Sequence, residues 1–129
     1  MDKISRINKA YNDFASGNVE EAMTVFHPDI VWNECKGFPF VTGDGIFQGA
    51  DAIDEGVFMK MPEYYEGFRV EIDELVEAGD IIIMIGHYVG IWAATGKHFR
   101  ANAVHVWTFE DDKVIRYFEA ADTAEIINP

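Results

Sequence analysis

The second half of the chain constrains the fold most, because four strand-like segments follow one another with only short turns between them. The turns lie in the patterns AGD, ATGK and EDDK. The segments are rich in Val, Ile, Tyr, Phe and Trp, and they cover residues 68–78, 81–93, 98–109 and 114–122. Strands joined by such tight turns predict an antiparallel meander.

Helical patterns occupy the first half. Ile4, Ile7, Tyr11 and Phe14 recur at the spacing of one helix face, with Asp2 as the expected N-cap. Helices are expected over 4–14, 18–26 (ended by Pro28) and 50–61, a strand over 29–34, and a loop with at most one short strand over 35–49. Helices that precede a meander predict an α+β fold. We expect a single domain over residues 1–129, with about three N-terminal helices on a curved, mostly antiparallel sheet that forms an open cone.

Charge and cysteine content limit which binding partners and which cellular location are expected. The chain has 10 Lys and Arg residues against 23 Asp and Glu residues, which gives a formal net charge of −13. Such a chain repels phosphate groups, so we expect neither nucleic acid nor a membrane as a partner. Cys35 is the single cysteine, the N-terminus lacks an apolar leader, and the apolar run IIIMIG is too short to span a bilayer. A reducing, cytoplasmic location is therefore expected.

Alternation along two strands selects the side chains that face inward. In HFRANAVHVWTF, the face with Ala103, His105 and Trp107 carries the large rings, so it is expected to face the core. In DIVWNE, the ring of Trp32 favours the same inward orientation, and Glu34 lies on its face. A histidine and a carboxylate are therefore expected beside the core.

Polar groups on these faces form the candidate site. Tyr11 lies on the apolar stripe of the first helix, so Tyr11, Glu34 and His105 are expected to converge on one cavity. Asp122 is a fourth candidate, although the pattern of the last strand leaves its facing open. Each has a structural alternative: Glu34 as a solvated or salt-bridged carboxylate, His105 and Tyr11 as hydrogen-bonded core residues, and Asp122 as a helix cap. The expected lining of the cavity is Phe14, Trp32, Tyr88, Ala103, Trp107 and Phe118.

Two long stretches of the chain resemble a known family. AYNDFASGNVEEAMTVFHPDIVW and GHYVGIWAATGKHFRANAVHVWTFEDDKVIRYFEAADT are similar to the SnoaL-like and ketosteroid isomerase-like branch of the NTF2-like superfamily. In its steroid isomerases the general base is an Asp at the end of the first strand, which corresponds to Glu34. The resemblance aligns the second carboxylic acid of the family with His105, and its catalytic Tyr with Ala10, next to Tyr11. Asp122 lies near the place where related polyketide cyclases have an acid.

The resemblance and the residues together predict an isomerase- or cyclase-type enzyme that acts on a small apolar carbonyl compound. Glu34 would take a proton next to the carbonyl, and His105, with Tyr11, would stabilise the enolate oxygen. No histidine pair has metal-ligand spacing, so we expect neither a metal nor a cofactor. The alternatives are a non-catalytic domain that binds an apolar ligand, and a structural dimerisation module with a filled cone. Val104 and Val106 make the outer sheet face apolar, which predicts a homodimer through that face.

Overall fold

The computed structural model describes residues 1 to 129, and it has an α+β fold. The helices are α1 (Lys3–Ala15), α2 (Val19–Ala22), α3 (Ala50–Ile53) and α4 (Thr123–Ile127). The strands are β1 (Phe26–Asn33), β2 (Ile46–Gln48), β3 (Tyr65–Ala78), β4 (Ile81–Trp92), β5 (Lys97–Glu110) and β6 (Lys113–Ala121). Short 3₁₀ turns cover Met23–Val25 and Met61–Glu63, and a π-helical segment covers Asp54–Phe58.

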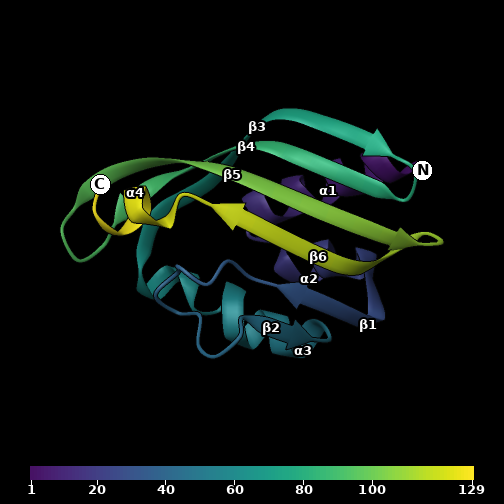
Figure 1. Cartoon of the computed structure of the whole chain (residues 1–129), viewed down its shortest axis with the longest axis horizontal. Helices are drawn as coiled ribbons and strands as arrows, with labels where there is room; N and C mark the ends of the chain where they lie inside the picture. The colour runs from purple at the N-terminus through teal and green to yellow at the C-terminus, as the bar shows by residue number, and fades with distance from the viewer.

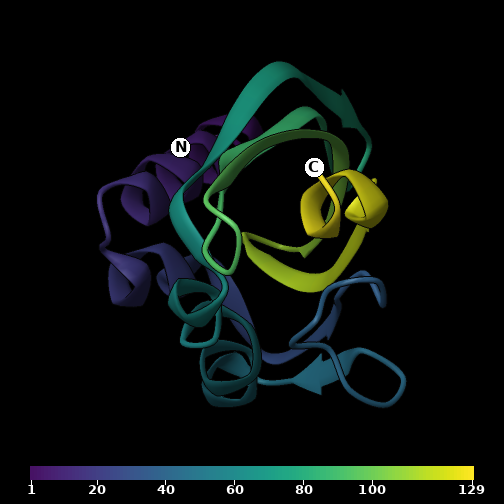
Figure 2. The same cartoon turned by 90° about the vertical axis from the view of Figure 1, so that its left-hand side faces the viewer.

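All strands belong to one curved sheet in the order β2-β1-β6-β5-β4-β3. β1 and β6 are parallel, whereas every other neighbouring pair is antiparallel. α1 and α2 lie behind the sheet in Figure 1, and the end-on view of Figure 2 shows the curl of the long strands β3 to β6, with α1 and α2 to its left. The predicted cone of helices on a curved, mostly antiparallel sheet is confirmed.

The first helix begins and ends where its sequence predicts. The Ser5 backbone N–H donates to Oδ1 of Asp2, the N-cap, at 2.8 Å. Gly17 follows the helix with a φ of 77°, a left-handed conformation that glycine adopts easily. Ile7 and Tyr11 are buried on the inner face. α1 therefore presents Tyr11 to the concave side of the sheet.

Two expected helices are shorter than predicted. The helix expected over 18–26 ends early because β1 already begins at Phe26 and runs through Pro28. The register of β1 on β6 shifts between Phe26 and Val31, and such an irregular stretch tolerates a proline that lacks an N–H. The helix expected over 50–61 divides into α3 and the π-helical segment.

An extra residue in β6 changes the facing of its side chains. Val114 pairs with Phe109 of β5, but Arg116 pairs with Thr108, so Ile115 is unmatched. Because side chains alternate along a strand, a shift of one residue exchanges the two faces beyond it.

The exchange of faces caused by the extra residue continues to the end of β6. Tyr117 pairs with Trp107 and Glu119 pairs with His105, so both face inward. Phe118 faces outward and is 48% exposed. A hairpin without the extra residue would have placed Phe118 beside His105.

Apolar side chains also gather on the outer face of the sheet. Ile83 pairs with Val106 and Ile85 with Val104 on neighbouring strands, and Phe118 pairs with Val106 from the other side. We call these five residues the outer apolar patch. None of the helices covers it in Figure 1.

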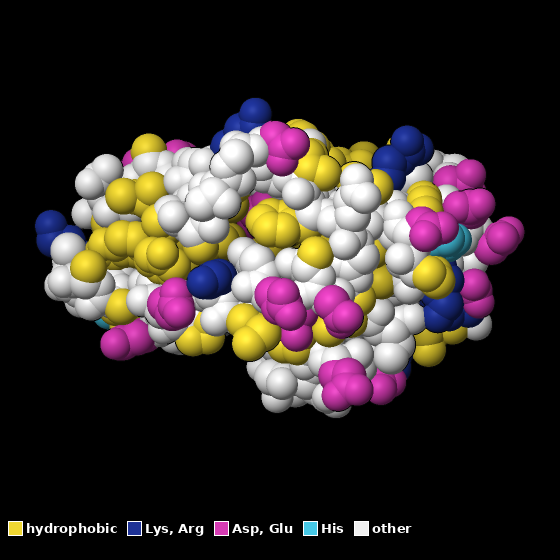
Figure 3. Space-filling model, turned by 90° about the horizontal axis from the view of Figure 1, so that it is seen from below, with side chains coloured by type: hydrophobic (Ala, Val, Ile, Leu, Met, Phe, Trp, Pro, Cys, Tyr) yellow, Lys and Arg dark blue, Asp and Glu magenta, His cyan; other side chains and the backbone are white.

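The rest of the surface is predominantly acidic, as the composition requires. Figure 3 views the molecule from the side of β2 and α3, and Asp and Glu groups lie there among apolar side chains, with fewer Lys and Arg groups. The structure contains no helix with the length and hydropathy that crossing a lipid bilayer requires.

Candidate active site

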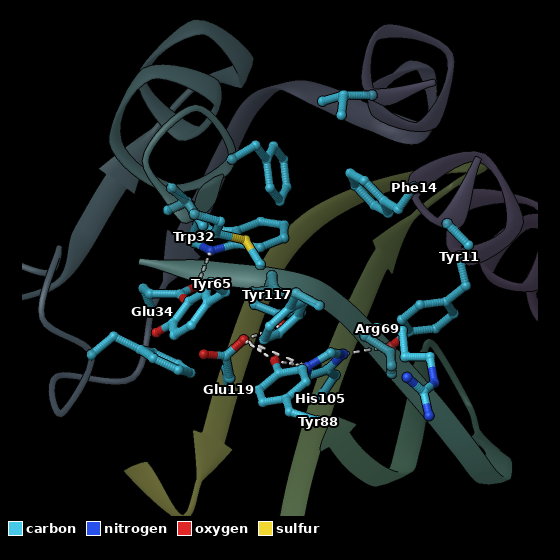
Figure 4. Close-up of a pocket in the computed structure, with 18 of the residues that line it drawn as sticks. Tyr11, Phe14, Trp32, Glu34, Tyr65, Arg69, Tyr88, His105, Tyr117 and Glu119 are labelled. Atoms are coloured by element: carbon cyan, nitrogen blue, oxygen red, sulfur yellow. Dashed lines mark hydrogen bonds and ion pairs between the residues drawn. The ribbon is translucent and has the colours of Figure 1, made fainter. Parts of the chain in front are cut away.

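One cavity lies between the concave face of the sheet, α1 and the segment that leads from α3 to β3. Its volume is about 240 Å³, and 16 of the 21 residues that line it are hydrophobic. An engineered cavity of about 150 Å³ holds benzene, so this cavity has room for a compound of one to two fused rings. Figure 4 shows Glu119, His105 and Tyr88 close together in the cavity, away from Phe14, with Arg69 beside Tyr11.

Most of the residues predicted for the site line this cavity. Tyr11, Glu34 and His105 come together in it from α1, the end of β1 and β5. The predicted lining residues that it contains are Phe14, Trp32, Tyr88 and Trp107.

Three predicted residues do not line the cavity, so these placements are wrong. Ala103 is buried on the inward face of β5, but it pairs with Ala121 at the far end of β6. Phe118 faces outward because of the extra residue in β6. Asp122 is exposed, since Ala121 takes the last inward position of that strand, and its side chain does not cap α4.

Glu34 directly follows β1, and local contacts fix its position. Its backbone N–H donates to the carbonyl oxygen of Gly45 at 2.9 Å. Gly45 has a φ of 74°, and a Cβ atom there would come within 2.8 Å of the Glu34 carbonyl oxygen. The indole N–H of Trp32 donates to Glu34 Oε1 at 2.8 Å.

The Glu34 carboxyl is 4% exposed. Burial raises its pKa well above the usual 4.5, and the charge of Glu119 raises it further. The bond from Trp32 opposes these effects only in part. The site therefore favours the protonated form of Glu34.

Glu119 is a site residue that the sequence pattern does not reveal. It is 5% exposed. The hydroxyls of Tyr88 and Tyr117 donate to Glu119 Oε2 at 2.5 Å and 2.8 Å, and such bonds stabilise an ionised carboxylate. Glu119 Oε1 is buried and makes no hydrogen bond, and in Figure 4 Glu34 and Tyr65 lie on the side of Glu119 away from His105. The two carboxyls therefore form a pair in which Glu34 favours the protonated form and Glu119 accepts two tyrosine hydroxyls.

A chain of hydrogen bonds runs through the site to Glu119. Because Tyr88 gives its only hydroxyl proton to Glu119, the His105 Nε2–H must donate to the Tyr88 oxygen. His105 Nδ1 then accepts from the Tyr11 hydroxyl at 2.6 Å, and the Trp107 indole N–H donates to the Tyr11 oxygen at 2.8 Å. Every bond in this relay donates in the direction of Glu119.

The hydrogen bonds of this relay, together with burial, determine the protonation state of His105. The ring is 4% exposed, and burial lowers its pKa to about 4, although the charge of Glu119 acts in the opposite direction. His105 is therefore neutral near pH 7, as the direction of its two hydrogen bonds requires. Both ring nitrogens are occupied, so a direct contact of His105 with a substrate oxygen does not fit this arrangement.

Fold and site together describe a small α+β domain with a carboxyl pair in an apolar cavity, and comparisons with known proteins assign its family. The sequence model of the SnoaL-like domain matches residues 7–117. An NTF2-like protein from Burkholderia thailandensis is 30% identical, with a TM-score of 0.86 over 95% of this chain and 92% of that protein. The chain therefore belongs to the SnoaL-like domain family within the NTF2-like fold, which confirms the resemblance in its sequence.

Two further solved structures share this fold. TerC, crystallised with polyporic acid, is 26% identical, with a TM-score of 0.84 over 95% of this chain and 93% of TerC. A protein from Mesorhizobium loti that is proposed to be a SnoaL-like polyketide cyclase is 17% identical, with a TM-score of 0.69 over 93% of this chain and 99% of that protein, and it shows the fold alone. No curated protein matches the chain.

Proposed function

We propose that this protein is a cofactor-free acid–base enzyme of the isomerase or cyclase type, and that it moves a proton on a small apolar carbonyl compound. The observation that carries the proposal is the pair of carboxyls, Glu34 and Glu119, in a cavity lined mainly by hydrophobic residues. A carboxyl that favours its protonated form, as Glu34 does, can act as an acid beside a second carboxyl that acts as a base.

The roles follow from the proton that the pair holds. Glu119 Oε1 takes a proton from the carbon next to the carbonyl, and the electrons of that C–H bond form a carbon–carbon double bond. The carbonyl oxygen takes the proton of Glu34, which gives an enol, a protonated Glu119 and an ionised Glu34. In a substrate with a conjugated double bond, the far carbon of that bond takes the Glu119 proton while the enol hydroxyl returns its proton to Glu34, which gives an isomeric ketone and restores both carboxyls. In a substrate with a second carbonyl, the enol carbon attacks that carbonyl carbon, the new alkoxide takes the Glu119 proton and the enol hydroxyl returns its proton to Glu34, which closes a ring.

This assignment revises the roles expected from the sequence. Glu34 becomes the acid, because its environment favours the protonated form, and Glu119 becomes the base. Tyr11 and His105 act through the relay by holding Tyr88 in position to donate to Glu119. They are positioning residues rather than contacts of the substrate.

The cavity also supports the proposed substrate class. Its aromatic and aliphatic lining suits a flat apolar frame, and its volume of about 240 Å³ suits one to two rings. The co-crystal of TerC with polyporic acid supports a small organic compound as the ligand of this type of cavity.

The test is proton exchange in D₂O with 2-tetralone, a bicyclic ketone with acidic C–H groups. We expect the protein to accelerate loss of the α-proton signals in NMR spectra, and Glu34→Gln and Glu119→Gln each to reduce the rate at least about 100-fold. Glu77→Gln removes an exposed carboxylate from β3 and should leave the rate unchanged. Binding without acceleration would favour the non-catalytic alternative, and equal rates in all variants would refute the carboxyl pair as the catalyst.

We further propose a homodimer in which the outer apolar patch of one copy packs on that of another. The patch spans three neighbouring strands, and a contiguous apolar face on an otherwise acidic protein is suited to a two-fold contact. The free thiol of Cys35 supports a reducing, cytoplasmic location.

A further inference from the structure

The Tyr65 hydroxyl is a buried polar group without a partner. Tyr65 lines the cavity, it is 4% exposed, and its hydroxyl makes no hydrogen bond. Folded proteins rarely leave a buried hydroxyl unpaired, and an exception in a cavity indicates a group that a ligand completes.

The other tyrosines of the cavity are already hydrogen-bonded within the protein. Tyr11 donates to His105, and Tyr88 and Tyr117 donate to Glu119. Tyr65 is thus the one cavity tyrosine whose hydroxyl proton is free for a ligand.

Aromatic packing fixes the Tyr65 ring where β3 begins. Its centroid lies 5.2 Å from that of Phe68, 5.6 Å from that of Phe99 and 5.8 Å from that of Trp92. A ring held on several sides keeps its hydroxyl in one place, so a ligand bond to it needs little ordering.

The hydroxyl lies on the Glu34 side of the carboxyl pair. Figure 4 shows Tyr65 beside Glu34, with the relay residues on the far side of Glu119. Burial raises the pKa of Tyr65, and negative charge on the neighbouring carboxyl pair, Glu34 and Glu119, raises it further. Tyr65 therefore stays protonated and offers a donor.

We propose that the Tyr65 hydroxyl donates a hydrogen bond to the carbonyl oxygen of the substrate, the same oxygen that faces the protonated Glu34 carboxyl. The Tyr65 hydroxyl and the Glu34 carboxyl would be two hydrogen-bond donors close together in a mainly apolar cavity. Such a site selects compounds that carry a single oxygen on a hydrocarbon frame. The role of Glu34 as a donor rests on the proposed function. The hydrogen bond from Tyr65 requires only that the ketone binds in the cavity.

Charge also explains why this contact assists the reaction. Glu119 loses its negative charge as it takes the proton, while negative charge grows on the substrate oxygen. The Tyr65 bond strengthens as that oxygen becomes more negative, so it stabilises the transition state more than the bound ketone.

The experiment compares two ligands that differ by one oxygen, 2-tetralone and the hydrocarbon tetralin. Dissociation constants are measured by calorimetry for the wild type, Tyr65→Phe and Tyr64→Phe. Tyr64 is the matched control, because it is the neighbouring tyrosine and its ring stacks on Trp92 outside the cavity lining.

We expect Tyr65→Phe to weaken binding of 2-tetralone about five- to tenfold and to leave tetralin binding unchanged. Tyr64→Phe should leave both unchanged. Tetralin binding also reports an intact cavity in each variant. An unchanged preference for the ketone in Tyr65→Phe, equal weakening of both ligands, or no preference in the wild type would overturn the inference.

The outcome is separable from that of the proposed function. If the ketone preference depends on Tyr65 but the wild type exchanges no protons, the Tyr65 contact stands and the enzyme proposal fails. If Glu34→Gln and Glu119→Gln abolish exchange while Tyr65→Phe changes neither binding nor exchange, the enzyme proposal stands and the Tyr65 contact fails.

Discussion

Replacing Glu34 by glutamine is expected to make the protein progressively more stable than the wild type as the pH rises. Glu34 is buried, and its pKa in the folded protein lies well above 4.5, the usual value that applies to the unfolded chain. Between these two pKa values the native state binds one proton more than the unfolded state. The contribution of Glu34 to the wild-type free energy of unfolding therefore falls by about 1.4 kcal/mol for each pH unit in this window.

Glutamine lacks this dependence but keeps the geometry. Its amide oxygen can still accept the Trp32 indole N–H, which donates to Glu34 Oε1 at 2.8 Å, and its amide N–H₂ can donate to Glu119 as a protonated carboxyl would. The stability difference between variant and wild type should be flat below pH 4.5. It should then rise by about 1.4 kcal/mol per pH unit and level off above the folded pKa of Glu34. His105 titrates in both proteins, so its contribution cancels in the difference.

The measurement is urea unfolding followed by tryptophan fluorescence between about pH 5 and about pH 9, at one protein concentration. Glu77→Gln is the control, because Glu77 is exposed on β3, and its difference curve should stay flat. A flat or falling curve for Glu34→Gln would show that native Glu34 is ionised, and the burial argument would then fail.

Two further predictions concern the relay and the outer apolar patch. The pKa of His105 is lowered from 6.5 to about 4, so His105 alone contributes a loss of about 1.4 kcal/mol of stability per pH unit as the pH falls through this range, opposite in sign to the contribution of Glu34. His105→Gln should lack that loss in the same unfolding assay, and an equal acid slope in both proteins would contradict a neutral His105. Phe118→Asp places a charge in the patch and should convert a dimer to a monomer in light scattering, whereas Lys97→Asp at the exposed start of β5 should not. An unchanged mass for Phe118→Asp would refute the proposed interface.

The parts of the fold that follow from local pattern could be predicted from the sequence. α1 has a cap, an apolar stripe and a glycine stop within one segment, and the meander has alternation with tight turns. The start of β1 could not be predicted in this way, because Phe26 and Pro28 enter a strand through pairing with β6, which lies at the other end of the chain. Distant pairing overrides a weak helical pattern there.

The residues of the site also fall into those that local pattern predicts and those that it does not. Alternation placed Glu34 and His105 inward, and both line the cavity. Glu119 and Phe118 have exchanged faces relative to a regular hairpin because of Ile115, and the turn EDDK carries no sign of that extra residue. The direction of the relay could not be predicted either, since it depends on which hydroxyl meets which ring nitrogen in three dimensions.

The pairing of β1 with β6 also has a consequence for the way the chain folds. The residues that make the site come from both ends of the sequence, and the bond between Tyr11 and His105 joins positions 94 residues apart. Contacts of such long range form late and slow folding. During synthesis β1 therefore cannot pair with β6 until β6 has left the ribosome. The cavity forms only after that pairing.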